Sequence, residues 1–193
     1  MSSSLKVINR GLIRLGVPPL ASLSDRSAQS MAADTVYTEI KKAALAEFPW
    51  SFALRETDLP ELSVPSGQER WSDLPYTYQL PNDVVRVLGL LNYGGYRLTG
   101  DQLHTDEKKP RLVYVTNVSE SHWPEFFQKV VSFDFAASVA VTLTDEVNRA
   151  DVMYQQAQLA RRTARAIDSQ QTPSPVLKLM QIYLRRGYNP MMS

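Results

Sequence analysis

The hydrophobic period of this chain changes twice, and these changes constrain the fold more than any other sequence feature. From Leu5 to Leu15 the apolar residues recur every three or four positions, which is the spacing of an amphipathic helix. After Trp50 the pattern becomes alternating, most clearly from Tyr76 to Leu80, and alternation is typical of strands. A helical period returns after Ser119. The pattern predicts helices at both ends of the chain and strands between them.

Each end of the chain is expected to contribute a pair of helices. The first pair lies within residues 1–50, with a break at Gly16 and a stop at Pro49. The second pair lies within residues 119–170. Its first helix is apolar on nearly all sides, which indicates a buried position, and Thr144 marks a capped restart into a longer helix. Small residues along that longer helix favour close antiparallel packing of the two.

These patterns predict an α+β fold that is mainly a helical bundle, formed by the N- and C-terminal helix pairs. Residues 51–118 are expected to form a small antiparallel β insert, a meander with a tight turn at Gly94-Gly95. Residues 171–193 are expected to form a hinge around Pro173 and Pro175 and a C-terminal tail. Because neither helix pair can bury its apolar face alone, we expect the two pairs to make one bundle.

Composition excludes several classes of function. The 193 residues include no cysteine, so disulfide scaffolds, thiol nucleophiles and cysteine zinc sites are ruled out. A formal net charge of +1 gives no overall electrostatic attraction for nucleic acid. The start of the chain does not resemble a signal peptide, and the longest apolar stretch is too short to cross a bilayer, so we expect no membrane role.

No catalytic constellation is evident. The two histidines, His104 and His122, have no second ligand at a metal-binding spacing, and we expect both to lie on the surface or in loops. Adjacent carboxylates such as Asp106 and Glu107 fall in expected loops, where solvation explains them better than acid–base chemistry. The sequence predicts a protein that is not an enzyme, with no catalytic residue, no cofactor and no metal ligand.

Charged residues in the second helix pair have two interpretations. Asp134 lies in the most apolar helix and is expected to be hydrogen-bonded or paired with an arginine, although an inter-subunit contact is the alternative. A basic run on the last long helix is either a solvated face or an interface. If it is an interface, the acidic corner before that helix could be its counterpart. The interface candidates are Asp145, Glu146, Arg161, Arg162 and Arg165.

The tail mixes apolar and basic residues and is too short to hold a core of its own. It could pack back on the bundle, or it could dock on a partner and become ordered there. The residues that would make this contact are Leu177, Leu179, Met180, Ile182, Tyr183, Leu184, Arg185 and Arg186.

Several short motifs, taken in order, resemble the head-to-tail adaptor or connector proteins of phages, in particular the tail tubular protein A-like gatekeeper group of short-tailed phages. The likeness covers about residues 5–170 and rests on the order and spacing of its parts. The first part is Ile8, Asn9, Leu12, Leu15 and Gly16 followed by Leu23 and Asp25, and the second is the aromatic segment 48–53. The third is Leu80-Pro81-Asn82-Asp83 followed by 84–87, and the fourth is Leu112, Tyr114 and Val115. The last is Trp123, Pro124, Phe126 and Phe127 with Ala136, Ala137, Ala140, Leu143 and Thr144.

The resemblance implies a virion structural protein, assembled in the host cytoplasm and located in the tail connector. Copies of the chain would form a ring of about twelve subunits beneath the portal protein, each contact joining two different faces. The ring would extend the DNA channel, let duplex DNA pass without sequence-specific binding, and provide a platform for a downstream tail or nozzle protein. The tail of this chain would then dock on the portal.

Two other functions remain open from the residues themselves. One is a generic α+β protein-interaction module that presents its β insert to a partner. The other is a hydrolase whose carboxylates come together only in the fold, which a pocket with paired, pKa-shifted carboxylates would indicate.

Overall fold

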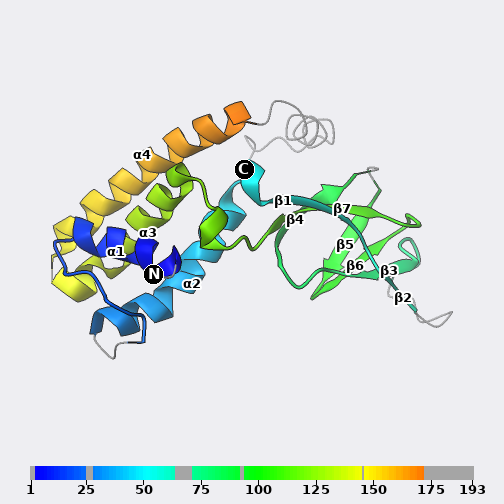
Figure 1. Cartoon of the computed structure of the whole chain (residues 1–193). Coiled ribbons are helices and arrows are strands. Elements are labelled where there is room, and N and C mark those ends of the chain that lie inside the picture. The colour runs from blue at the N-terminus through cyan, green and yellow to red at the C-terminus, as the bar shows by residue number, and fades with distance from the viewer. Residues whose placement is uncertain (1–2, 25–27, 64–70, 92–93, 145, 172–193) are drawn as a thin grey trace. The chain divides into compact units, whose positions relative to one another are not determined.

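The chain divides into two compact units in a computed structural model that describes residues 3–24, 28–63, 71–91, 94–144 and 146–171 (Figure 1). One unit, the helical unit below, takes Met1–Phe52 and Val118–Gln171. The other, the β unit below, includes Ala53–Asn117. Both ends of the described chain therefore contribute to the helical unit, and the β unit interrupts it in sequence.

The helical unit holds four α-helices among the described residues: α1 (Ser3–Arg14), α2 (Ala28–Glu47), α3 (Glu125–Thr144) and α4 (Val147–Gln171). Two short 3-10 turns, η1 (Ser51–Ala53) and η2 (Glu120–His122), lie where the chain leaves the helical unit and where it returns. The first helix ends as the sequence predicts, because Gly16 takes a φ of 72° and the amide of Val17 bonds back to the carbonyl of Leu12.

Helix α3 lies at the centre of the helical unit and packs against α1, α2 and α4. It is long and apolar enough to span a membrane by length and composition alone, yet its large side chains Phe127, Val131 and Phe135 are fully buried in this unit. Gly11 allows α1 to approach it closely, since a Cβ at that position would lie 2.7 Å from Phe135 Cδ1 and 2.9 Å from the carbonyl oxygen of Ser132.

Seven strands make two antiparallel sheets in the described part of the β unit. The three-stranded sheet has the order β1-β7-β4 and the four-stranded sheet the order β2-β3-β6-β5. Leu54 pairs with Val115 across β1 and β7, which joins the first and last strands of the unit. The strands are β1 (Leu54–Asp58), β2 (Glu61–Leu62), β3 (Tyr76–Gln79), β4 (Val84–Leu90), β5 (Tyr96–Thr99), β6 (Gln102–Thr105) and β7 (Arg111–Thr116).

Both sheets contribute to one apolar core in the β unit. Tyr78 and Leu103 come from the four-stranded sheet, and Leu112 and Tyr114 come from the three-stranded sheet. The Leu-Pro-x-Asp turn between β3 and β4 is held against β7, because the Asp83 carboxylate accepts hydrogen bonds from the hydroxyls of Tyr114 and Thr116. This turn therefore closes one end of the three-stranded sheet.

The expectation of a mainly helical bundle with a small β insert is wrong. The described residues form an α+β structure with four helices and two antiparallel sheets of seven strands, and the strands form a core of their own rather than a minor insertion. The expected meander is also wrong, because β1 pairs with β7 and not with its neighbour in sequence. β1 reads Leu-Arg-Glu-Thr-Asp and is mostly polar, so its side-chain pattern understates the extent of the sheet.

Candidate interaction surfaces

An aromatic cluster joins two segments of the helical unit that are far apart in sequence. The ring of Phe127 on α3 lies 5.0 Å from the ring of Trp50 and 4.8 Å from that of Trp123, centroid to centroid. Each indole also donates to a main-chain carbonyl, Trp50 to Ala44 at 2.9 Å and Trp123 to Val118 at 3.0 Å. Both indoles are therefore buried with their polar group satisfied, which such a position requires.

A buried carboxylate closes the same region from α4. Asp168 is 2% exposed, and its two oxygens accept hydrogen bonds from the amide of Ser51 at 2.9 Å and from the hydroxyl of Ser51 at 2.8 Å. Ser51 follows Trp50 directly, so the end of α4 holds the segment by which the chain leaves the helical unit. Sequence reasoning missed this contact, because Asp168 stands among polar residues near the helix end and nothing nearby marks it as buried.

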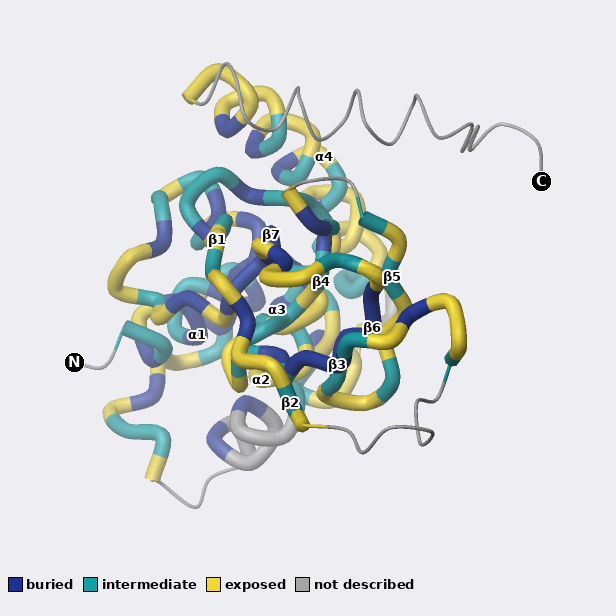
Figure 2. The backbone as a smooth tube through the Cα atoms, turned by 90° about the vertical axis from the view of Figure 1, so that its right-hand side faces the viewer, coloured by how far each residue is buried: buried dark blue, intermediate teal, exposed yellow. Residues whose placement is uncertain are grey.

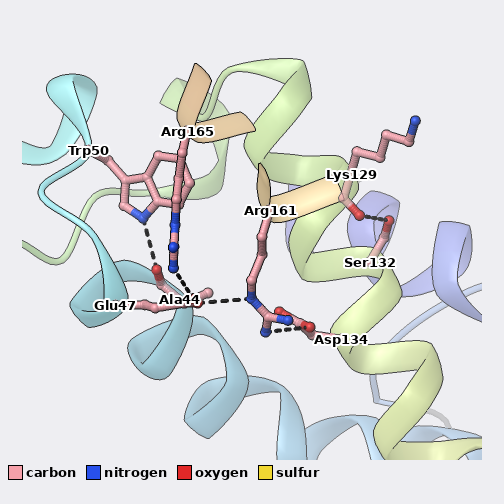
Figure 3. Close-up of polar contacts among 8 residues, drawn as sticks. All are labelled: Ala44, Glu47, Trp50, Lys129, Ser132, Asp134, Arg161 and Arg165. Carbon is pink, nitrogen blue, oxygen red and sulfur yellow. Dashed lines mark hydrogen bonds and ion pairs between the residues drawn. The ribbon is translucent and has the colours of Figure 1, made fainter. Parts of the chain in front are cut away.

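A network of charges links α2, α3 and α4 (Figure 3). Arg161 on α4 donates to Asp134 on α3 at 2.6 Å and to Glu47 at the end of α2 at 2.9 Å, and Arg165 also pairs with Glu47. The prediction that Asp134 pairs with an arginine is confirmed. The arginines satisfy carboxylates within one subunit, so their guanidinium groups are already engaged before any second copy is present.

Within this network, the carboxyl of Asp134 has a pKa far from its ordinary value. Burial raises the pKa of Asp134 to about 6, since removal from water disfavours the charged form more than the Arg161 guanidinium favours it. Glu47 adds a smaller effect in the same direction as burial. The folded chain therefore binds a proton here at a pH where the unfolded chain has released it.

Stability should consequently fall as pH rises through the titration of Asp134. Between about pH 4 and pH 6 the folded state holds the extra proton, so acid favours folding at this group. We expect the free energy of unfolding of the native chain, relative to an Asp134→Asn variant, to drop by about 2 kcal/mol from pH 4 to pH 7. Urea unfolding of both proteins across that range measures the difference, and a difference that rises with pH would contradict it.

The predicted interface residues occupy different environments. Glu146 lies before α4 and pairs with Arg149 at 3.0 Å, whereas Arg161 and Arg165 belong to the network above. Arg162 is exposed and forms no ion pair with the described residues. Asp145 and the whole predicted tail contact, residues 177–186, lie outside the described residues. The structure thus leaves Arg162 as the exposed basic candidate on α4 without an ion pair in the described chain.

The expectation that both histidines lie on the surface or in loops is wrong for His104. His104 lies on β6 and is 3% exposed, with Nδ1 3.1 Å from the Thr77 hydroxyl and its ring against Trp71. His122 is exposed on η2 beside Ser121. Strand alternation places His104 on the face of β6 opposite to the core residue Leu103, and the ring of Trp71 lies 4.6 Å from the His104 ring on that face. Residue types alone do not reveal this burial. No group of three or more potential metal ligands gathers among the residues that the structure describes.

An open groove lies between the end of α1 and the start of α4. Its volume is about 600 Å³, and its lining includes Ile13, Arg14, Glu146, Arg149 and Val152. The side chain of Arg149 bridges across it to the carbonyl of Leu15 at 2.7 Å. Ile13 is 61% exposed and Val152 is 50% exposed, so the groove presents apolar side chains to its opening. Its mixed apolar and charged lining is suited to protein contact rather than to acid–base chemistry.

Comparison with known proteins leaves the family of this chain open. No protein-family model matches the sequence, and a search of curated proteins finds no similar sequence.

Proposed function

We propose that this protein is a structural component of a phage virion, a head-to-tail connector adaptor. Copies of it would form a ring beneath the portal protein, extend the DNA channel and carry the next tail or nozzle protein. The proposal rests on the ordered set of motifs that resembles tail tubular protein A-like adaptors. It includes assembly in the host cytoplasm and a role that involves no enzymatic step.

The arrangement of the motif residues supports the proposal. The aromatic segment 48–53 and the later Trp123–Phe127 segment meet at the ring of Phe127. Asn9, from the first motif, pins the loop after α1 by a pair of hydrogen bonds with the main chain of Leu20, at 2.9 and 2.8 Å. Asp83 from the turn motif is bound to β7. Each of these motifs thus has a specific structural task in the fold.

The charge of the chain is compatible with a channel protein. Phosphate contacts add up steeply with the number of basic side chains, so a ring that lets duplex slide through should offer few of them. The formal net charge is +1, and the arginines of the α4 network are neutralised by Glu47 and Asp134. The basic tail segment 177–186 is then the natural candidate for docking on the portal.

Sedimentation with the cognate portal tests this function. We expect the full chain to co-sediment with the portal and a chain that lacks residues 173–193 to stay in the supernatant. The shortened chain should keep the helical far-ultraviolet circular dichroism signal of α1 to α4, which shows that its helical unit is still folded. A Tyr154→Ala variant, altered at an exposed position on α4, serves as the matched control and should co-sediment like the native chain. A full chain that ignores the portal would refute the connector function, whereas unimpaired docking of the shortened chain would refute the role of the tail.

A further inference from the structure

The outer face of α4 lies opposite the face by which this helix packs on the helical unit. The packed face carries the buried residues Ala157, Ala160 and Ala164. The outer face consists of exposed residues spaced three or four positions apart, which places them on one side of a helix, and Figure 2 shows the alternation of buried and exposed positions along α4. Its members are Asn148, Asp151, Val152, Gln155, Leu159, Arg162 and Ala166.

Apolar side chains run along the outer face. Val152 is 50% exposed and Leu159 is 59% exposed, and Ala166 follows at the same seven-residue spacing. At its N-terminal end the face continues into the groove beside α1, where Val152 and the exposed Ile13 line the same opening. An exposed Leu159 therefore lies two helical turns from Val152, which lines the open groove on the same surface.

Two unpaired charges flank these apolar residues. Asp151 and Arg162 are both exposed, are about three turns apart and project to the same side of the outer face. Neither takes part in an ion pair with the residues that the structure describes, in contrast to Arg161 and Arg165 on the other side of the helix. Among the described residues, no opposite charge therefore pairs with the acidic end or the basic end of the face.

We propose that the occupant of this face is a second copy of the chain, with the two α4 helices antiparallel about a two-fold axis near Gln156. In that arrangement Leu159 of each copy enters the groove of the other beside Ile13 and Val152, and Asp151 of each copy faces Arg162 of the other. The midpoint between Val152 and Leu159 and the midpoint between Asp151 and Arg162 lie on either side of position 156, one residue or about 1.5 Å apart along the helix. One antiparallel register therefore satisfies the apolar and the charged contacts together, as an isologous contact requires.

This pairing goes beyond the connector function and does not depend on it. The contact is small, with three large apolar side chains from each copy and two ion pairs in all, so we expect a weak dimer with a dissociation constant on the order of 100 µM. A two-fold contact is closed after two copies and cannot propagate around a ring. In a connector, the pairing would therefore belong to the free protein and would have to separate before ring closure.

Sedimentation equilibrium of the free chain between about 10 µM and 1 mM tests the pairing. We expect dimers of the native chain, with affinity reduced about tenfold or more by Asp151→Arg and by Arg162→Asp, since each change places two like-charge pairs in the contact. The doubly exchanged Asp151→Arg/Arg162→Asp chain should recover affinity to within about threefold of the native chain, because the charges again oppose each other. Tyr154→Ser, an exposed change on another side of α4, should leave the affinity unchanged.

Disulfide trapping provides a second measurement that requires no purified partner. The native chain has no cysteine, so a single Gln155→Cys substitution can form a disulfide only between copies. We expect it to oxidise to dimer about tenfold faster than Tyr154→Cys, because position 155 lies next to the two-fold axis. Equal rates, a native chain that stays monomeric at 1 mM, or an exchanged pair that fails to recover affinity would overturn the proposal. So would dimers that appear only after deletion of residues 172–193, which would assign the face to that segment.

All of these measurements use the free chain without a portal. A failure of the two-fold contact would therefore leave the connector function standing. A failure of portal binding would, in turn, leave the two-fold contact standing.

Discussion

Replacing Trp50 by alanine should destabilise the helical unit by about 4 kcal/mol, the largest effect that we expect of any single substitution. Trp50 is fully buried, and its ring contacts Phe48, Phe52 and Phe127. Truncation removes this apolar surface and leaves a cavity, and it also strands the carbonyl of Ala44 without the indole donor. The loss falls where α2 ends and the chain turns towards the β unit.

Urea unfolding followed at 222 nm measures this effect, since the helices of the helical unit dominate that signal. The two compact units need not unfold together, so the helical transition should be analysed by itself. Tyr154→Ala is the matched control, an aromatic side chain that is 58% exposed in the same unit, and should change stability by less than about 0.5 kcal/mol. A loss below about 1 kcal/mol for Trp50→Ala would show that the aromatic cluster does not hold the unit together.

Replacing Asp168 by alanine should cost the helical unit about 3 kcal/mol. The substitution removes both hydrogen bonds to Ser51 and leaves the Ser51 amide without its acceptor in a partly buried site. We expect the amide of Ser51 to exchange hydrogen faster by at least about tenfold, because its hydrogen bond to the Asp168 carboxylate is lost. Asp151→Ala, which removes an exposed carboxylate from the same helix, should be nearly neutral in both measurements.

A double-mutant cycle separates the Asp168 contact from general effects of the substitution. If Asp168 acts through Ser51, then Ser51→Ala should cost much less in the Asp168→Ala background than in the native chain, with a coupling of about 1 kcal/mol. Additive losses would contradict a direct role for the hydroxyl of Ser51 and leave only the amide contact.

The helices could be predicted from the sequence because their signals are local. Gly16 ends α1 by adopting a positive φ, and the apolar surface of α3 on all sides corresponds to its central position. The partner of Asp134 could be expected in kind, since a carboxylate in an apolar helix needs a hydrogen-bonding group. Which arginine it would be could not, because Arg161 and Arg162 differ only in the side of the helix on which they lie.

The sheets could not be predicted to the same extent because their contacts are not local. The alternation after Trp50 indicates a strand at β1, but β1 and β7 pair across the whole β unit, and no local pattern shows that partner. β2 has two residues, too few for any alternation to be visible. The hydrogen bonds between Ser51 and Asp168 also join the two halves of the sequence, and no local sequence pattern predicts a contact between residues so far apart.

The exposed faces show the same contrast between local pattern and tertiary context. The small residues along α4 are expected to pack closely, and Ala157, Ala160 and Ala164 do, but Tyr154 is 58% and Ile167 is 37% exposed. The width of the buried face depends on how α3 crosses α4, which the α4 sequence alone does not determine. Only with burial known does the opposite face, with Val152 and Leu159, stand out as apolar and as lacking a packing partner in the part of the chain that the structure describes.

The central claim, that this chain is a connector adaptor, is tested most directly by imaging a mixture of the full chain with its cognate portal. Light scattering would give the mass of the complex, and negative-stain images would show its shape. The connector function predicts a closed ring of copies seated on the portal, with a mass that matches a full set of subunits. A portal that stays bare, with the chain at the mass of its free form, would contradict it.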